Sequence, residues 1–311
     1  FLLVWMNEQD EIELQTSGST GQKKSISAKK SYLKASANLT LDFFHLSEKS
    51  TILHCLPFGF IAGKMMLIRV LESNAQVCFA PPTDPLAFET TAAIDFAAMT
   101  PYQYAKCLEN NPKKLEQIRT ILLGGGAVNL ELETQIKQLN HKVYHSYGMT
   151  ETFSHVALRK IGQYEHFTAL TGVRFGYGSE KTLTIHAPHL GIDTLETNDI
   201  VDLLDPFHFR FVGRKDFVIN SGGIKLHPEE LEQKISTKFT NVNYFFASKP
   251  DPKLGEALIL LIEAEEQFPL PDLSVLLEKY ERPKEVLFCK KFAYTASGKL
   301  DRLNTLKTSL P

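Results

Sequence analysis

Thr120-Ile121-Leu122-Leu123-Gly124-Gly125-Gly126 joins a short apolar run directly to three glycines. Short apolar runs of this kind are typical of strands that are buried on both faces of a parallel sheet. A second run, residues 142–145, ends in the same way at Ser146-Tyr147-Gly148. Because ligands bind at the carboxyl ends of the strands in such sheets, the two endings predict a binding site at one edge.

The flanking sequence extends this pattern between residues 50 and 148. Short apolar runs alternate there with segments of helical periodicity, which predicts an α/β fold with a largely parallel sheet. The expected strands cover residues 51–55, 76–80, 95–99, 120–123 and 142–145. The expected helices cover residues 64–72, 101–109 and 130–139.

The pattern changes in the second half of the chain. Short strands at residues 183–186, 200–204 and 209–212 predict a β-rich subdomain at about residues 168–212. The sequence after Gly213 predicts a small α+β domain, with the order strand, Gly-Gly turn, helix, strand, strand, helix, strand. Its first helix is expected at residues 228–238 and begins with proline and acidic residues. We therefore expect a larger domain at residues 1–216 and a smaller one at residues 217–311.

The composition excludes several classes of function. The chain has 311 residues, a formal net charge of −2 and 43% hydrophobic residues. This balance gives no indication of a nucleic-acid partner, and no apolar run approaches the length of a membrane span. The four cysteines are widely spaced, so we expect neither a zinc site nor a disulfide framework, and the chain fits a reducing cytoplasm.

A loop rich in hydroxyl, glycine and lysine residues lies near the start of the chain. Such a loop can direct backbone N–H groups, hydroxyls and a mobile cation at phosphate oxygens. It is not a Walker A loop, because Lys23 stands where the second glycine of that motif is required. Composition alone leaves a solvated loop as the alternative. The predicted phosphate-binding residues are Thr16, Ser17, Gly18, Ser19, Thr20, Gly21 and Lys24.

Four further motifs follow this loop in a fixed order. They are Tyr147-Gly148-Met149-Thr150-Glu151, Asn198-Asp199, Gly213-Arg214-Lys215-Asp216 with the following Ser221-Gly222-Gly223-Ile224-Lys225, and Ser297-Gly298-Lys299. With these five motifs the chain resembles the acyl-adenylate-forming superfamily along nearly its whole length. The resemblance implies a large α/β amino-terminal domain with a β-rich subdomain and a small, mobile α+β carboxyl-terminal domain.

The resemblance also implies a reaction and its cofactors. A carboxylate attacks the α-phosphate of ATP in the presence of Mg²⁺, pyrophosphate leaves, and coenzyme A then accepts the acyl group. Fixed donors and cations must neutralise the charge that develops in the first step. By this resemblance Lys299 would reach the carboxylate and the α-phosphate, Thr150 would contact the α-phosphate, and Glu151 would bind Mg²⁺. Considered one by one, these residues could equally be a solvated lysine and a helix cap.

The remaining nucleotide contacts and the hinge are assigned in the same way. Asp199 and Arg214 would bind the ribose, although either could instead form a surface ion pair. Adenine would lie between Tyr147 and the backbone of three glycines, Gly124, Gly125 and Gly126, which could equally form a tight turn. Asp216 would be the hinge. The loop that lines the thiol tunnel would contain Ser221, Gly222, Gly223 and Lys225, with a simple hairpin turn as the alternative.

The acid substrate is predicted from finer features. Only 15 residues precede the phosphate loop, and Thr152 and Ser154 follow the Tyr-Gly-Met-Thr-Glu motif, which resembles the short o-succinylbenzoate:CoA ligases of menaquinone synthesis. An aromatic dicarboxylic acid needs apolar walls and a donor or cation at depth. We expect walls from Phe58, Phe60, Gly63, Gly125 and Met149, and candidates for the distal carboxylate in Lys64, Ser154 and His155.

Two other functions stay open on the sequence alone. The chain could be another aryl- or acyl-CoA synthetase, or an enzyme that adenylates an acid for a carrier protein. It could also be a nucleotide-binding protein that has lost catalysis, although Lys24, Glu151, Asp199, Arg214 and Lys299 are all present. A homodimer is possible. The loop departs from the family pattern in having Lys23-Lys24-Ser25 where Pro-Lys-Gly is usual, but it retains Lys24.

Overall fold

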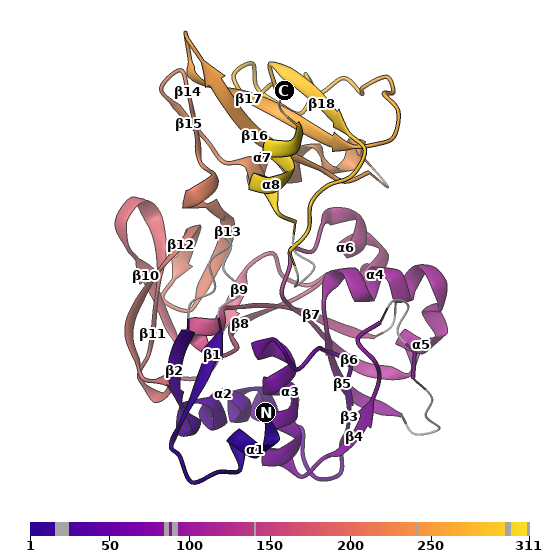
Figure 1. Cartoon of the computed structure of the whole chain (residues 1–311), viewed down its shortest axis with the longest axis vertical. Helices are drawn as coiled ribbons and strands as arrows, with labels where there is room; N and C mark the ends of the chain where they lie inside the picture. Colours follow the sequence, from indigo (N-terminus) through magenta and orange to yellow (C-terminus); the bar gives the residue numbers. More distant parts are fainter. Residues whose placement is uncertain are drawn as a thin grey trace.

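The computed structural model describes residues 1–15, 25–83, 87–88, 93–139, 141–239, 242–295 and 300–309. One 11-stranded sheet, in the order β10-β11-β12-β13-β9-β8-β7-β6-β5-β3-β4, runs through the large domain. A small domain with its own sheet lies above it in Figure 1. No helix in these ranges is long and apolar enough to cross a membrane.

The parallel half of the large sheet contains the five strands that the sequence predicts. These strands are β3 (Thr51–His54), β4 (Gln76–Phe79), β5 (Ile94–Met99), β6 (Ile118–Leu123) and β7 (Lys142–Gly148). All four pairings among them are parallel. Five of the six residues of β6 are buried, as expected for a strand covered on both faces.

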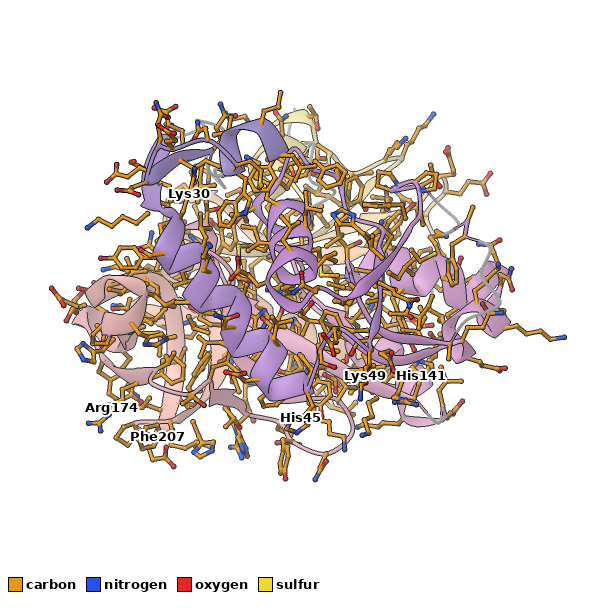
Figure 2. The ribbon with its side chains drawn as sticks, turned by 90° about the horizontal axis from the view of Figure 1, so that it is seen from below. Lys30, His45, Lys49, His141, Arg174 and Phe207 are labelled. Atoms are coloured by element: carbon orange, nitrogen blue, oxygen red, sulfur yellow. The ribbon has the colours of Figure 1, made fainter. Side chains whose placement is uncertain are left out.

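Helices cover both faces of this half. Alternate residues of β5 explain the two layers, since Phe96 and Ala98 join one core cluster and Ala97 and Met99 join the other. The first cluster packs against α2 (Lys30–Phe44) and α3 (Ile61–Ser73), and Figure 2 shows α2 crossing this face from Lys30 to His45. The second packs against α4 (Pro101–Asn110), α5 (Pro112–Glu116) and α6 (Leu130–Lys137).

The antiparallel half corrects the predicted boundary of the β-rich subdomain. After β7 the chain turns back through the short helix η1 (Thr150–Thr152), so β8 (His155–Lys160) pairs antiparallel with β7. A turn this short cannot make the crossover that parallel strands require. The β-rich part therefore begins at residue 155 and continues the same sheet. Its other strands are β9 (Phe167–Ala169), β10 (Arg174–Tyr177), β11 (Thr182–Ala187), β12 (Ile192–Asp205) and β13 (His208–Arg214).

The amino-terminal segment forms a separate hairpin beside α2. It contains α1 (Leu2–Trp5), β1 (Glu11–Gln15) and β2 (Ser25–Lys29), and β1 pairs antiparallel with β2. The predicted phosphate loop, residues 16–24, connects these two strands and lies outside the described residues.

The small domain is α+β, but its order of elements differs from the prediction. It contains β14 (Ile219–Ser221), β15 (Ile224–Leu226), α7 (Pro228–Ile235), β16 (Tyr244–Asp251), β17 (Gly255–Glu263), β18 (Glu285–Cys289) and α8 (Arg302–Ser309). The Gly-Gly turn joins two strands, because Gly222 and Gly223 have φ of 60° and 85° and close a tight hairpin. The predicted helix before the last strand is wrong. Pro269 and Pro271 disfavour a helix in that segment, and α8 follows β18 instead.

Candidate functional site

The ends of β6 and β7 lie side by side, as the sequence predicts. Gly124 follows β6, and a Cβ atom there would lie 2.6 Å from Ser146 Oγ on β7, so a larger residue would require the Ser146 hydroxyl to move. Gly125 has a φ of +81°, which favours glycine. Gly125 and Gly126 are exposed. The glycines therefore form a tight turn and also present an accessible backbone edge, so both interpretations of this segment hold.

A histidine that sequence analysis did not select lies under this edge. His145 Nε2 is 3.1 Å from the carbonyl oxygen of Gly126, and its Nδ1 is buried without a partner among the described residues. Burial, with the nearby Arg159 charge, lowers the pKa of His145 to about 4. The imidazole is therefore neutral near pH 7, and it fixes the backbone of the glycine turn.

Four residues of the predicted nucleotide and hinge motifs form one connected network. Tyr147 Oη donates to Asp199 Oδ2 at 2.5 Å. Arg214 donates to Asp199 Oδ1 at 3.2 Å and to Asp216 Oδ2 at 2.5 Å. The register of β12 and β13 places Asp199 directly opposite Arg214. The structure thus brings together the predicted ribose-binding residues and joins them to the predicted hinge.

Electrostatics fix the protonation of Tyr147 and Arg214 in this network. Burial raises the pKa of Tyr147, and the adjacent Asp199 carboxylate raises it further, so the phenol stays protonated. Burial opposes the charge of Arg214, but the contacts with Asp216 and Asp199 outweigh it and raise its pKa. The ring of Tyr147 is only 9% exposed and packs against Phe167 and Phe209. Its expected contact with adenine stays a prediction.

The turn after β7 points a carboxylate outward. Thr150 is buried and Glu151 is exposed, and Glu151 has no hydrogen bond or ion pair to any described residue. The turn is fixed by Thr152, whose Oγ1 accepts from Met149 N at 2.9 Å and donates to the carbonyl oxygen of Ser154 at 2.7 Å. No group of three or more possible metal ligands occurs in the described part of the chain. The single exposed carboxylate of Glu151 fits Mg²⁺, because this ion often takes one or two carboxylates and completes its shell with phosphates and water.

A buried arginine lies beside this turn, and sequence analysis missed it. Arg69 on α3 is 2% exposed and donates to Ser154 Oγ at 2.7 Å. Its Nε has no hydrogen-bond partner, and no carboxylate among the described residues pairs with it. Burial lowers the pKa of Arg69 to about 9. The signal was an arginine within the apolar run Met65–Val70, where a helix faces the core.

Other polar groups gather around Arg69. His155 Nδ1 lies 3.3 Å from Ser154 Oγ, and His155 Nε2 lies 3.3 Å from Thr40 Oγ1. Burial and the Arg69 charge lower the pKa of His155 well below its usual value, so it is neutral. Ser36 Oγ is buried without a partner in the described ranges. Two of the three predicted candidates for the distal carboxylate, Ser154 and His155, therefore lie beside a cation that pairs with no described carboxylate.

The third candidate, Lys64, lies elsewhere. It lines an open cavity of about 720 Å³, and its Nζ is 5.9 Å from the ring centroid of Phe1. Lys64 and Arg69 are five positions apart on α3, so they project about 140° apart around the helix. The cavity is lined by Phe1, Val4, Gln9, Glu11, Ile12, Glu13, Ser27, Phe58, Gly59 and Lys64.

The predicted apolar walls are only partly brought together. Phe58 is exposed in the Lys64 cavity, whereas Phe60 is half-buried at the start of α3 and Met149 packs on the main core. Gly63 is not a pocket wall, which corrects the prediction. It is buried inside α3, where a Cβ atom would lie 2.2 Å from the carbonyl oxygen of Pro57. Gly63 is therefore required by helix packing.

One predicted motif of the small domain contacts the large domain. Lys225 on β15 forms an ion pair with Glu180 at 3.0 Å. Residues 296–299, including Lys299, lie outside the described residues. On either side of them Tyr294 and Leu300 form an antiparallel bridge. Burial and Glu263 raise the pKa of Tyr294 to about 12, and Tyr102 of α4 adds a smaller contribution, so this bridge lies near the large domain.

The sequence is similar to that of known acid:CoA ligases and matches one enzyme family. The model of the family described as AMP-binding enzyme matches residues 14–174. The chain is 27% identical to 2-succinylbenzoate–CoA ligase of Listeria monocytogenes, over 98% of this chain and 71% of the relative. It is 25% identical to the ligase of the same name from Lactococcus lactis, over 95% and 70%.

Solved structures show the same likeness. An acyl-CoA synthetase (AMP-forming)/AMP-acid ligase II-like protein from Dyadobacter fermentans is 36% identical, with a TM-score of 0.65 over 100% of this chain and 93% of that one. The o-succinylbenzoate coenzyme A synthetase of Bacillus subtilis, in complex with ATP and magnesium, has a TM-score of 0.80 at 20% identity, over 96% and 70%. At that identity the second likeness concerns the fold.

Proposed function

Because the chain belongs to the AMP-binding enzyme family, we propose that it is an ATP-dependent acid:CoA ligase whose acid is o-succinylbenzoate. The names of the Listeria and Lactococcus relatives support this choice of acid. The observation in the structure that carries it is Arg69, which is buried beside Ser154 and pairs with no carboxylate among the described residues. A neutral or monocarboxylic acid would leave that cation uncompensated.

The proposed reaction has two half-reactions. In the first, a carboxylate oxygen of the acid bonds to the α-phosphorus of ATP and the bond to the pyrophosphate oxygen breaks, which gives acyl-AMP. In the second, the thiol of coenzyme A gives up its proton to solvent, its sulfur bonds to the acyl carbon, and the bond from that carbon to the AMP oxygen breaks. Mg²⁺, when bound, neutralises charge on the phosphates, and Glu151 is the described residue suited to hold it.

The described residues would bind the nucleotide from two sides. Asp199 can accept from the ribose hydroxyls while Arg214 donates to the same sugar. Tyr147 holds the Asp199 carboxylate through its 2.5 Å hydrogen bond, which limits the ways in which the carboxylate can rotate. The roles of the phosphate loop and of Lys299 stay predictions, since these residues lie outside the described ones.

The acid would extend from the Thr150 turn toward Arg69. Ser154 follows that turn by four residues and contacts the Arg69 guanidinium directly. A second carboxylate placed there would replace lost hydration with charge-assisted hydrogen bonds from Arg69, Ser154 and the neutral His155. In a pocket without a cation the same carboxylate would lose its hydration without compensation, so this cluster would select dicarboxylic acids over monocarboxylic ones.

A second candidate is another acyl-CoA synthetase of the same family. The 36% identity to the Dyadobacter protein favours it, because that protein's name specifies no acid. Either enzyme would act on small molecules, and we place it in the cytoplasm, where a chain with four free cysteines is stable. A homodimer stays a prediction.

One assay separates these candidates. The enzyme is incubated with ATP, Mg²⁺ and coenzyme A, and with either o-succinylbenzoate or one of the two analogues that lack one of its carboxyl groups. We expect thioester with o-succinylbenzoate and a large loss of kcat/KM with the analogue that keeps the reacting carboxyl group and lacks the distal one. Equal turnover of o-succinylbenzoate and this analogue would remove o-succinylbenzoate as the substrate, and pyrophosphate release without thioester would point to a different acceptor.

A further inference from the structure

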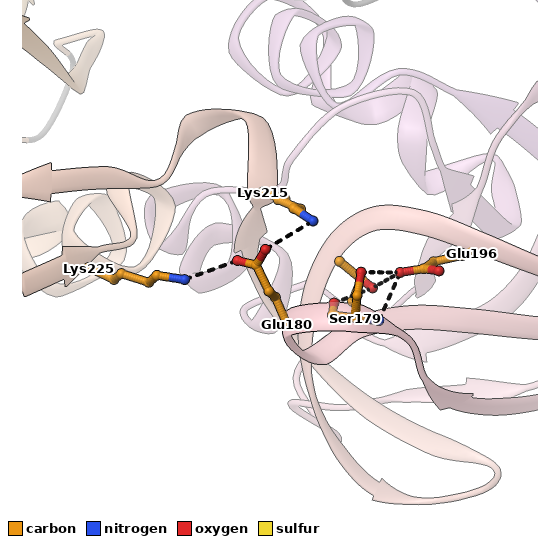
Figure 3. Close-up of polar contacts among 6 residues, drawn as sticks. Ser179, Glu180, Glu196, Lys215 and Lys225 are labelled. Atoms are coloured by element: carbon orange, nitrogen blue, oxygen red, sulfur yellow. Dashed lines mark hydrogen bonds and ion pairs between the residues drawn. The ribbon is translucent and has the colours of Figure 1, made fainter.

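The turn between β10 and β11 presents one carboxylate to two lysines near the hinge. Glu180 Oε1 lies 3.2 Å from Lys215 Nζ, and its Oε2 lies 3.0 Å from Lys225 Nζ (Figure 3). Lys215 directly precedes Asp216, the predicted hinge, whereas Lys225 lies on β15 beyond the Gly-Gly turn. A single side chain of the large domain therefore contacts the chain on both sides of the hinge.

The backbone of this turn is strained. Glu180 and Lys181 have φ of 53° and 62°, although neither is glycine. Two consecutive left-handed residues of this kind are unfavourable and persist only where the surrounding structure fixes them. Strain of this sort is concentrated at functional and switch segments.

Glu196 of β12 holds the turn. It accepts hydrogen bonds from Ser179 N at 2.9 Å, Ser179 Oγ at 2.7 Å and Thr182 Oγ1 at 2.7 Å (Figure 3). These donors lower the pKa of Glu196 to about 2, so it stays charged. At Gly178 a Cβ atom would lie 2.5 Å from Glu196 Oε1, so glycine is needed there. The result of this support is a fixed position for Glu180.

The two lysines differ in what a domain rotation would do to them. Lys215 lies before the hinge and moves with the large domain, so its contact with Glu180 survives a rotation about Asp216. Lys225 lies nine residues beyond the hinge on the small domain, and the same rotation separates it from Glu180. Only the Glu180–Lys225 pair therefore reports on the orientation of the small domain.

We propose, on the basis of the acid:CoA ligase function proposed above, that Glu180 is a positioning residue that holds the small domain in its present orientation through Lys225. In this orientation the Tyr294–Leu300 bridge lies near the large domain. The pair has to break before the Gly222–Gly223 hairpin can move toward the site for the second half-reaction. Lys215 keeps Glu180 charged and in place while the pair is broken.

The expected effect is modest. Both partners are more than half exposed, with side-chain exposures of 58% for Lys225 and 51% for Glu180. Exposed ion pairs of this kind shift an equilibrium by about two- to fivefold. Glu180→Gln should therefore accelerate the second half-reaction about two- to fivefold and slow adenylation by a similar factor. Salt above physiological concentration should reduce the difference between wild type and variant.

The test uses the whole chain and one readout that needs no substrate. Hydrogen–deuterium exchange of residues 219–226 is compared among wild type, Glu180→Gln, Lys225→Gln and the double variant. We expect both single variants to accelerate exchange and the double variant to add little, because they break the same contact. Lys215→Gln should have a smaller effect. The control is Glu109→Gln, which breaks an exposed pair with Lys106 on α4.

The two half-reactions are then measured separately in the same variants. Additive effects of the two single variants on the exchange rate of residues 219–226, or equal exchange rates in Glu180→Gln and Glu109→Gln, would show that the Glu180–Lys225 contact does not hold the small domain. Altered exchange with an unchanged ratio of the two half-reaction rates would overturn the positioning role. Altered exchange in a protein that activates no tested acid would support the contact while overturning the proposed function, so the two failures are distinguishable.

Discussion

Replacing Arg69 with methionine should raise stability and destroy selectivity together. Burial lowers the pKa of Arg69 to about 9, which corresponds to roughly 4–5 kcal/mol of lost hydration that no carboxylate among the described residues offsets. Methionine has a similar length and no charge. The substitution also removes the hydrogen-bond donor of Ser154, which offsets part of the gain. We therefore expect a net increase of about 1–3 kcal/mol in the free energy of unfolding.

The same substitution removes the proposed partner of the distal carboxylate. Loss of one member of a buried, hydrogen-bonded charge pair weakens binding by about 2–4 kcal/mol, or roughly 30- to 1,000-fold. The KM for o-succinylbenzoate should rise by this factor. The KM of the analogue that lacks the distal carboxyl group should change little, since that acid never pairs with Arg69.

Two assays measure the two halves of this prediction. Thermal unfolding without substrate should show a midpoint raised by about 2–4 °C per kcal/mol. Substrate-dependent pyrophosphate exchange gives the KM ratio of the diacid to the analogue. The matched control is Lys64→Met, a change on the same helix at a residue that lines the open cavity, and it should leave the ratio unchanged. A lower midpoint with equal losses for both acids would show that Arg69 is a structural residue.

Three further predictions concern other parts of the molecule. Lys299→Ala should slow adenylation by at least about 10²–10³-fold and spare thioester formation from preformed acyl-AMP, whereas equal loss of both steps would contradict its role. Burial raises the pKa of Glu229 to about 7, above its unfolded value, so its contribution to stability is present below about pH 4 and is lost as the pH rises to 7. Glu229→Gln should therefore stabilise the protein by up to about 3 kcal/mol at pH 8 and hardly at all at pH 4, and a pH-independent difference in the unfolding midpoint would refute this. Gly63→Ala should destabilise by about 1–3 kcal/mol because its Cβ would meet the Pro57 carbonyl, while Gly59→Ala, which has nothing within 4 Å, should be neutral; equal midpoints would be inconsistent with the packing described.

Much of the fold is written in local patterns. The five parallel strands and three of the helices between them, α3, α4 and α6, were predicted, because burial on both faces imposes continuous apolar runs and a helix on the surface imposes its own period. The residues of the proposed nucleotide site could also be selected from the sequence, since they lie within short motifs, and their binding roles stay predictions. The order of elements near the carboxyl terminus was wrong where strands of three residues, such as β15, carry too little pattern to recognise.

The sequence by itself determined the family, the parallel core and the residues at the ends of β6 and β7. Only the tertiary structure decided what those residues meet. Arg69 contacts Ser154 across 85 positions, and Lys225 contacts Glu180 across 45, and neither pair leaves a local signature. Periodicity records how deeply a residue is buried, because each element must hide one face. Which distant side chains share that burial depends on how the elements pack, and a buried cation without a partner becomes visible only when its neighbours are in place.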